Sequence, residues 1–212
     1  MRGFSNQEIT ALSKRFISGK PFPHVVIENF LDKDNVDKSR QAPTRGWDNH
    51  KRLLLELKKE SFAKKDSDLF TFKQTGNLFY SRNPIVAAAV TMFSSGQFAQ
   101  LISLISGIRL KPGAVDVSGS LYEKTDYLLC HDDRLEGRKI AFILYLSESF
   151  TAADGGALVF LTAKGRHPDK KVFAYPPLQN SLMIFAVSKK SWHEVEEVLA
   201  DKKRYTIGGW LH

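Results

Sequence analysis

The sequence predicts a mainly β fold with flanking helices (α+β), in which helices come first and an antiparallel sandwich or jelly roll follows. Three observations predict this class. From about residue 115 onward, short apolar or alternating segments succeed one another, with breakers such as Gly155-Gly156 and Pro176-Pro177 between them. Stretches rich in helix formers come before that point. Strands and helices do not alternate regularly, as they would in a parallel sheet built from βαβ units.

The length of 212 residues is enough to bury a substantial core as one domain. The chain has no internal repeat, low-complexity tract or convincing interdomain linker. We therefore expect a single domain over residues 1–212, with a helical and strand support region at 1–114 and an eight-stranded core at 115–212. Hydrophobic residues make up 42% of the chain and aromatic residues 11%, which excludes wholesale disorder.

The first predicted element is a short amphipathic helix near the start of the chain. Ser5 and Glu8 have the spacing of a capping box, and apolar residues from Ile9 to Ile17 then recur at helical intervals. We expect this helix to end at Gly19. Four further segments precede residue 115: a strand at 21–31, a polar helix fragment or loop at 31–49, a helix at 51–64, and two short helices at 85–107 broken around Ser94 to Gly96.

Eight segments after residue 115 have the length and composition of strands. They are residues 115–123, 126–132, 138–147, 156–161, 171–176, 181–187, 193–199 and 204–211.

The cysteine content limits the chemistry that the chain can carry. Cys130 is the only cysteine, which excludes an intramolecular disulfide and a multi-cysteine zinc site and favours a reducing compartment. We expect its side chain to act as a small buried hydrophobe. No apolar run is long enough to span a bilayer, and the first residues lack the apolar stretch of a secretory signal. We therefore expect an intracellular protein, in the cytoplasm or nucleus, with no membrane partner.

The charge balance is basic. The formal net charge is +8 and the pI is near 9.5, which favours contact with nucleic acid or a ribonucleoprotein. However, the lysines occur mostly as scattered pairs, a pattern typical of a solvated surface. Charge alone therefore names no function.

One histidine and two aspartates interrupt the apolar segments between residues 128 and 146. Residues two apart on a strand project to the same face, so a strand at 126–132 would direct His131 and Asp133 together and Asp132 away. His193 opens the alternating segment HEVEEV in the same sheet region and is the natural third ligand of a metal site. We expect structural or solvent-exposed roles for the other histidines, which are His24, His50, His167 and His212.

Two histidines and one carboxylate form the facial triad that binds Fe(II) and leaves coordination positions open. The same ligands suit a catalytic zinc ion with a bound water. Arg204 begins the segment RYTIGGWL, so it can stand on the next antiparallel strand and pair with a carboxylate of a dicarboxylic acid that chelates the metal. Tyr145 can donate its hydroxyl to the same carboxylate.

Several motifs together resemble the Fe(II)- and 2-oxoglutarate-dependent oxygenases of the prolyl hydroxylase type. They are His131-x-Asp133, Asp154-Gly155-Gly156-x-Leu158, Ser191-Trp192-His193-x-Val195, and Arg204-x-Thr206 followed by Trp210. More narrowly, SLYEKTDYLLCHDDRLEGRKIAFILYL and DLFTFKQTGNL look like the eukaryotic ribosomal prolyl 3-hydroxylases. The resemblance covers about residues 20 to 212.

The resemblance implies a double-stranded β-helix, a jelly-roll or cupin-like core with the N-terminal helices packed on one sheet. It implies that His131, Asp133 and His193 hold Fe(II) and that Arg204 and Tyr145 hold the distal carboxylate of 2-oxoglutarate. The cosubstrates would be 2-oxoglutarate and O2, with ascorbate as a stimulant. Family members also carry a second, catalytically silent barrel, and the sequence ends where the first barrel would end.

The implied reaction is hydroxylation of a prolyl residue of a small-subunit ribosomal protein at the decoding centre, with release of succinate and CO2. Residues 66–83 would either flank the prolyl loop or form an ordinary packed connection. Ribosomal RNA is a further expected contact. The alternatives are an oxygenase that acts on another protein or on nucleic acid, a zinc-dependent hydrolase, and a noncatalytic barrel that binds a partner.

Overall fold

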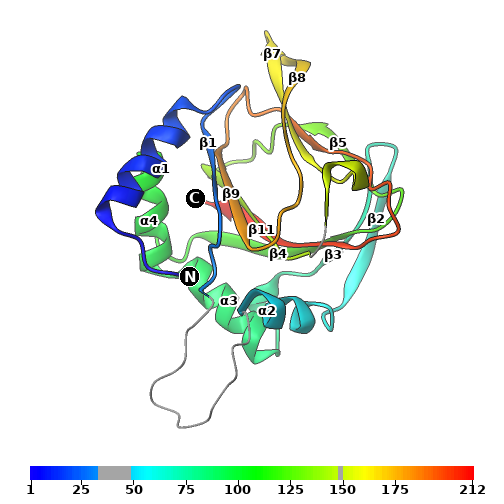
Figure 1. Ribbon diagram of the computed structural model, residues 1–212, viewed down its shortest axis with the longest axis horizontal. Helices are drawn as coiled ribbons and strands as arrows, with labels where there is room; N and C mark the ends of the chain where they lie inside the picture. Colours follow the sequence, from blue (N-terminus) through cyan, green and yellow to red (C-terminus); the bar gives the residue numbers. More distant parts are fainter. Residues whose placement is uncertain (33–48, 148–149) are drawn as a thin grey trace.

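The structure is a computed structural model that describes residues 1–32, 49–147 and 150–212 (Figure 1). The polar segment expected at 31–49 therefore lies almost wholly outside the described residues. The helices are α1 Asn6–Ser18, α2 Asn49–Leu57, α3 Pro84–Ser94 and α4 Gly96–Ser106, with 3-10 turns η1 Leu78–Tyr80 and η2 Ala152–Asp154. The strands are β1 His24–Ile27, β2 Phe62–Ser67, β3 Phe70–Thr75, β4 Val115–Tyr122, β5 Tyr127–His131, β6 Ile140–Tyr145, β7 Leu158–Lys164, β8 His167–Tyr175, β9 Ser181–Ala186, β10 His193–Val195 and β11 Arg204–Leu211.

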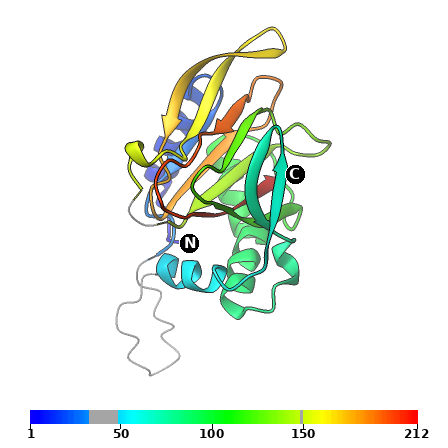
Figure 2. The ribbon, with the colours of Figure 1, turned by 90° about the vertical axis from the view of Figure 1, so that its right-hand side faces the viewer.

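The strands of the described residues form one antiparallel sheet with the order β1-β9-β6-β11-β4-β3-β5-β10-β7-β8, and β2 pairs with β3 outside this path. Strand β3 joins the two halves of the sheet, because Gln74 pairs with Ser120 of β4 while Phe70 pairs with Leu128 of β5. The sheet curls until its edge strands approach each other, as the ring centroids of His24 on β1 and Phe173 on β8 lie 4.6 Å apart. The result is an open barrel (Figures 1 and 2).

The predicted fold class is confirmed. Strands β4 to β11 are eight in number and match the eight predicted segments in order. The double-stranded β-helix that the resemblance implied is the jelly-roll arrangement seen here, with the N-terminal helices gathered on one face of the sheet (Figure 2).

Alternation along the strands divides the core into two layers. On β6, Phe142 and Leu144 pack against the helices, whereas Ala141 and Tyr145 face the barrel interior. Phe142 is fully buried and stacks on Phe93 of α3 with ring centroids 4.7 Å apart. Burying one such side chain contributes about 1.5–3 kcal/mol, so the helical layer holds this half of the barrel in shape.

Helices α1, α3 and α4 begin and end where the sequence indicates. Ser5 and Glu8 form the capping box of α1. Ser95 ends α3 and also caps α4, since its hydroxyl accepts a hydrogen bond from the backbone N–H of Phe98 at 3.1 Å. One cap residue thus explains the break between the two predicted short helices. No single helix of the described residues is long and apolar enough to cross a membrane; α3 and α4, bent by 48°, meet that test only as a pair.

The helix expected at 51–64 is wrong beyond Leu57. Residues Phe62–Ser67 form strand β2, which pairs with β3 over six positions. The backbone groups on one side of this segment pair with β3, and the helix-favouring lysines 64 and 65 project into solvent. Charged residues are common on such edge strands, so residue propensity was overridden by tertiary pairing.

Candidate active site

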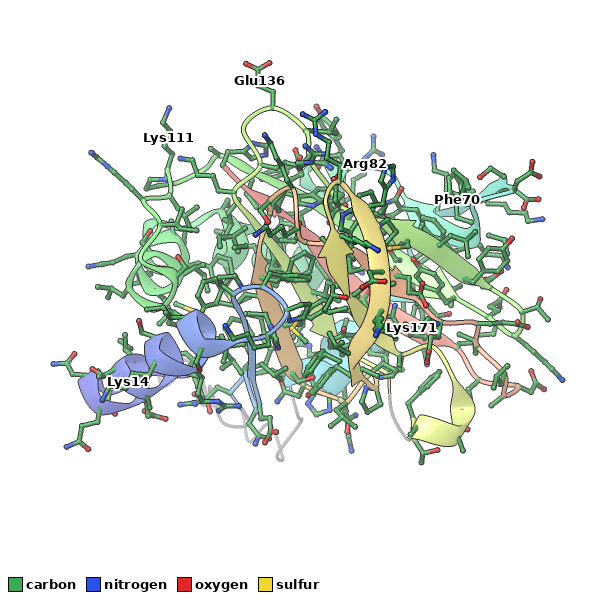
Figure 3. The ribbon with its side chains drawn as sticks, turned by 90° about the horizontal axis from the view of Figure 1, so that it is seen from above. Lys14, Phe70, Arg82, Lys111, Glu136 and Lys171 are labelled. Atoms are coloured by element: carbon green, nitrogen blue, oxygen red, sulfur yellow. The ribbon has the colours of Figure 1, made fainter. Side chains whose placement is uncertain are left out.

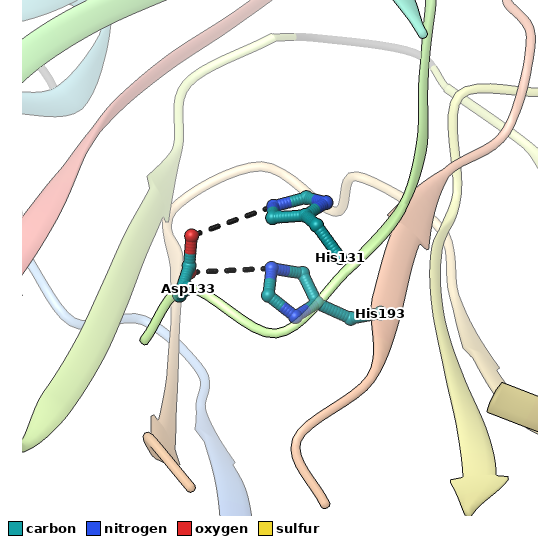
Figure 4. Close-up of side chains that lie close together, drawn as sticks. All are labelled: His131, Asp133 and His193. Atoms are coloured by element: carbon teal, nitrogen blue, oxygen red, sulfur yellow. Dashed lines mark ion pairs between the residues drawn. The ribbon is translucent and has the colours of Figure 1, made fainter. Parts of the chain in front are cut away.

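The two histidines of the predicted triad are brought together by strand pairing. His131 is the last residue of β5 and His193 is the first residue of β10, and the two are directly opposite each other in the antiparallel register. Opposite residues of paired strands project to the same face. Their ring centroids consequently lie 4.2 Å apart (Figure 4).

Asp133 completes the cluster by a route that strand alternation did not predict. It lies beyond the end of β5, and its backbone is in the left-handed region with φ +60°. This turn brings its carboxylate against both imidazoles (Figure 4), with Oδ1 3.4 Å from Nε2 of His131 and Oδ2 3.3 Å from Nε2 of His193. The predicted convergence is therefore present, but a left-handed turn after the strand produces it.

The donor set fits a single divalent metal ion. One ligand atom from each of the three residues lies within 4.8 Å of the others. Bonds of about 2.1 Å at right angles would place two ligand atoms about 3 Å apart, close to the separations between Asp133 and the imidazoles.

Backbone carbonyls fix the orientation of both imidazoles. Nδ1 of His131 lies 2.9 Å from the carbonyl oxygen of Leu129, and Nδ1 of His193 lies 2.8 Å from that of Ser191. A carbonyl only accepts hydrogen bonds, so each Nδ1 carries the proton and donates it. Each Nε2 faces Asp133. It can donate a proton to this carboxylate when no metal is bound, and on giving up that proton it offers its lone pair to a metal, which is the usual arrangement of histidine ligands.

The electrostatics of the cluster favour an ionised carboxylate. Burial alone would raise the pKa of Asp133, but hydrogen bonds from His131 and His193 and the nearby imidazole charges outweigh it and hold this pKa well below the usual range. For His131, burial lowers the pKa, yet the hydrogen bond and charge of Asp133 raise it overall. The carboxylate is thus already in the form that binds a cation.

A buried guanidinium forms the second part of the site. Arg204 begins β11, and its side chain is only 1% exposed. Its guanidinium carbon lies 4.9 Å from the ring centroid of Tyr122 and 5.2 Å from that of Tyr145. Among the residues that the structure describes, its Nε and Nη2 and the Tyr145 hydroxyl have no hydrogen-bond partner. Burying an unpaired cation is costly, so the arrangement fits an anion bound between Arg204 and Tyr145.

The Asp154-Gly155-Gly156 turn supports Arg204 from behind. Gly155 and Gly156 have φ +73° and +67°, values that favour glycine. A Cβ on Gly155 would lie 2.1 Å from the Glu197 carbonyl oxygen, and one on Gly156 would lie 3.2 Å from Cδ of Arg204. The turn therefore requires glycine both for its conformation and for its close approach to the arginine stem.

The triad and Arg204 share one cavity of about 170 Å³ inside the barrel, whereas Tyr145 packs behind Arg204 and is not part of the cavity lining. Its lining includes the triad, Arg204, Phe72, Gln74, Ser118, Tyr122 and Trp210. Tyr122 is a cavity residue that the sequence reasoning missed. Burial raises its pKa in spite of the nearby Arg204, which keeps its hydroxyl protonated. Tyr122 could have been found from its spacing, because Ser118, Ser120 and Tyr122 are two residues apart on β4 and all three side chains therefore point inward.

The other polar residues singled out in the sequence lie away from the triad. His24 is buried between aromatic rings, His50 is a buried residue of α2, and His167 is exposed. Nε2 of His212 lies 3.4 Å from an oxygen of Asp116. The Asp132 carboxylate accepts a hydrogen bond from Nε of Arg134 at 2.7 Å.

Cys130 lies half-buried beside Trp192, next to a small apolar cluster outside the barrel. Burial and the charges of Glu194 and Asp132 raise its pKa to about 11, in spite of Lys171. The thiol is therefore protonated near neutral pH, as expected for a hydrophobe.

An open jelly roll that holds a His-x-Asp…His cluster beside a buried, unpaired arginine defines the class of metal-dependent oxygenases that use a 2-oxo acid. Residues 117–212 match the model of the 2OG-Fe(II) oxygenase superfamily. This part of the chain, which holds the triad and Arg204, is similar to that superfamily. The chain is also similar to "Prolyl 3-hydroxylase OGFOD1" of Mus musculus, with 38% identity over 194 residues, covering 91% of this chain and 33% of the mouse protein.

A second relative is "Prolyl 3,4-dihydroxylase OGFOD1" of Ostreococcus tauri, which is 32% identical over 210 residues, covering 91% of this chain and 38% of the algal protein. The chain spans about a third of the length of the curated relatives it matches.

Solved structures share the fold at low sequence identity. A Pseudomonas putida prolyl-4-hydroxylase superposes with a TM-score of 0.72 at 17% identity, covering 96% of this chain and 98% of that one. A Trichoplax adhaerens prolyl hydroxylase, solved with a peptide fragment of hypoxia inducible factor, gives a TM-score of 0.71 at 16% identity, covering 100% and 93%. These likenesses establish the barrel architecture.

The first prediction concerns the carboxylate of the triad. Asp133→Ala leaves only two imidazoles, so we expect the affinity for Mn(II), measured by calorimetric titration without cosubstrate, to fall by more than the roughly 10- to 100-fold that loss of an outer-shell partner causes. The fold should persist, because the substitution empties no apolar core. Unchanged Mn(II) affinity in the folded variant would exclude Asp133 as a ligand.

The second prediction concerns the buried guanidinium. Arg204→Ala removes the charged partner of the anion, so we expect the dissociation constant of 2-oxoglutarate for the Mn(II)-loaded protein to rise by about 30-fold or more, equivalent to about 2 kcal/mol. Mn(II) affinity without 2-oxoglutarate serves as the control and should change little. An unaltered 2-oxoglutarate affinity would remove Arg204 from this role.

Proposed function

We propose that the protein is an Fe(II)- and 2-oxoglutarate-dependent oxygenase that hydroxylates a prolyl residue of a small-subunit ribosomal protein at the decoding centre. The observation that carries the proposal is the convergence of the triad and the unpaired Arg204 in one cavity. The names of the relatives, prolyl 3-hydroxylases and a prolyl 3,4-dihydroxylase, support the reaction type.

In this proposal His131, Asp133 and His193 hold Fe(II), and Arg204 and Tyr145 hold the distal carboxylate of 2-oxoglutarate. The iron and 2-oxoglutarate, together with O2, supply the oxidising chemistry, and succinate and CO2 are released. The contribution of the chain is geometry and exclusion of water. Phe185 packs edge-on against the His193 ring with centroids 4.8 Å apart, so one side of that imidazole is dry.

The cavity also has walls that suit a prolyl residue in a peptide. Phe72 of β3 lines it and stacks on Tyr122 with ring centroids 5.0 Å apart, which offers an apolar surface to a pyrrolidine ring. Nε2 of Gln74 donates to Oγ of Ser118 at 3.1 Å on the same wall, which places amide and hydroxyl groups where peptide groups would lie. The segment 66–83 thus contributes Phe72 and Gln74 to the cavity, which supports a place for it beside the prolyl loop.

Contact with ribosomal RNA is supported by a basic hairpin. Strands β7 and β8 form a ribbon that projects beyond the rest of the barrel (Figure 1). Lys164, Arg166 and Lys170 near its tip are exposed. Cations alone suffice to bind a phosphate backbone. Such an enzyme would work in the cytoplasm or nucleus.

A zinc-dependent hydrolase is the weaker alternative. It would use the triad and a bound water, but it has no use for a buried arginine that requires an anion. The same objection applies to a noncatalytic barrel.

The third prediction tests the reaction itself. With Fe(II), 2-oxoglutarate and O2, we expect a proline-containing peptide of the decoding-centre protein to gain the mass of one or two oxygens, with succinate formed in step. A peptide with alanine in place of the proline is the matched control and should stay unmodified. Hydroxylation of a residue other than proline, or product formed without 2-oxoglutarate, would contradict the proposal.

The fourth prediction tests the basic hairpin. Reversing Lys164, Arg166 and Lys170 to glutamate should slow hydroxylation on intact small subunits, reduce the salt dependence of that reaction, and leave hydroxylation of the free peptide unchanged.

The control for the hairpin reverses the same number of charges at Lys14, Lys111 and Lys124. Lys14 and Lys111 lie on the helical side of the molecule, away from Lys171 on β8 (Figure 3). Equal losses in both triple variants would show a general charge effect and would exclude a role for the hairpin.

A further inference from the structure

Arg138 lies outside the triad but contacts the segment that carries Asp133. This segment, residues 132–139, connects β5 to β6 and projects from the barrel with Glu136 toward its tip (Figure 3). The Arg138 side chain is only 15% exposed. Its Nη1 donates a hydrogen bond to the backbone carbonyl oxygen of Asp133 at 3.4 Å.

The guanidinium of Arg138 is itself held in place. Its carbon lies 3.4 Å from the ring centroid of Trp210 on β11, which is a stacked cation–π contact. Its Nε lies 4.0 Å from a carboxylate oxygen of Asp116 on β4. The backbone of the next residue is anchored as well, because the Lys139 N–H donates to the Leu211 carbonyl at 2.9 Å. Arg138 therefore links the 132–139 segment to strand β11.

Asp133 needs such a link more than the two histidines do. Strand pairing and the Nδ1 hydrogen bonds position both imidazoles. Asp133 lies beyond the strand with φ +60°, a conformation that costs a residue with a Cβ about 1–2 kcal/mol. The preceding carbonyl, that of Asp132, accepts a hydrogen bond from Oγ of Ser191 at 3.0 Å. Arg138 provides the corresponding contact at Asp133 itself.

From these contacts we infer that Arg138, stacked on Trp210, is a positioning residue that holds the Asp133 backbone in the left-handed turn and so presents its carboxylate to the metal. The inference rests on the proposed metal site. It gives Trp210 a role as the platform for this arginine.

The direction in which Arg138→Ala changes the Mn(II) affinity distinguishes a positioning role from a purely electrostatic effect. Arg138 is a cation close to a site for a divalent cation, so its charge alone opposes metal binding. If charge were its only influence, Arg138→Ala would bind Mn(II) more tightly. If it positions Asp133, the same substitution weakens binding, by about 10- to 100-fold as is typical for a partner that orients a metal ligand.

The experiment is a calorimetric titration of Mn(II) into the whole chain, without 2-oxoglutarate or peptide. We expect Arg138→Ala to bind about 10- to 100-fold more weakly than wild type, and Arg138→Lys, which keeps the charge but loses the planar fork, to fall between them. Trp210→Leu should weaken binding in the same direction, because it removes the platform. Visible absorption of the Co(II) form should also change in Arg138→Ala, since the ligand geometry differs.

Arg134→Ala is the matched control. This substitution removes the same charge, and Arg134 is nearer to Asp133 in the sequence. However, Arg134 pairs with the Asp132 carboxylate, and its side chain is 46% exposed. Its loss should leave Mn(II) affinity within about threefold, because it makes no contact that orients a metal ligand. If Arg138→Ala fails to fold, as judged by metal-free thermal unfolding, Arg138→Lys and Trp210→Leu decide the question.

Mn(II) binding by Arg138→Ala that equals or exceeds that of wild type would overturn the inference. So would equal weakening by Arg134→Ala. If Arg138→Ala hydroxylates proline as the wild type does and binds Mn(II) with unchanged affinity, the role of Arg138 is excluded while the proposed function stands. Absence of Mn(II) binding by wild type would defeat the proposed function and this inference with it.

Discussion

The antiparallel pairing of β5 with β10 is the constraint on which the site depends. It places His131 directly opposite His193, so two ligands that are 62 positions apart in the chain share one face of the barrel. A shift of one residue in this register would direct one imidazole to the outer face. The register is supported on the other side of β10, where His193 pairs with Phe160 of β7. Sheet geometry, rather than loop conformation, therefore sets the distance between the imidazoles.

The rest of the site departs from regular strand geometry, and it does so where function requires. Asp133 occupies a left-handed turn immediately after β5, and the glycines at 155 and 156 occupy positive φ values behind Arg204. Nε and Nη2 of Arg204 are buried without a hydrogen-bond partner among the described residues. Such features lower stability, so the apolar layer between helices and sheet must offset them. A bound anion would pair with Arg204, and the binding free energy of a metal ion would offset the cost of the Asp133 turn.

Much of the architecture could be predicted from the sequence, because the alternation of apolar residues and the turn residues between segments are local signals. The eight strands after residue 115 follow from them. The strand at 62–67 could not be predicted from local signals, since its lysines favour a helix and only pairing with β3 makes it a strand. The His-x-Asp spacing indicated convergence of His131 and Asp133. The turn that achieves it is inferred to depend on Arg138, which stacks on Trp210. Trp210 is far from Asp133 in the sequence, and so no local pattern revealed this contact.

The proposed function requires that one metal ion and one 2-oxo acid bind side by side in this barrel. The most direct test is anaerobic addition of 2-oxoglutarate to the Fe(II)-loaded protein, followed by visible absorption, because chelation of ferrous iron by a 2-oxo acid produces a charge-transfer band. The proposed function predicts a band that requires both components and saturates at about one equivalent of each per chain. Failure of the band to appear, with both components present in excess, would contradict it.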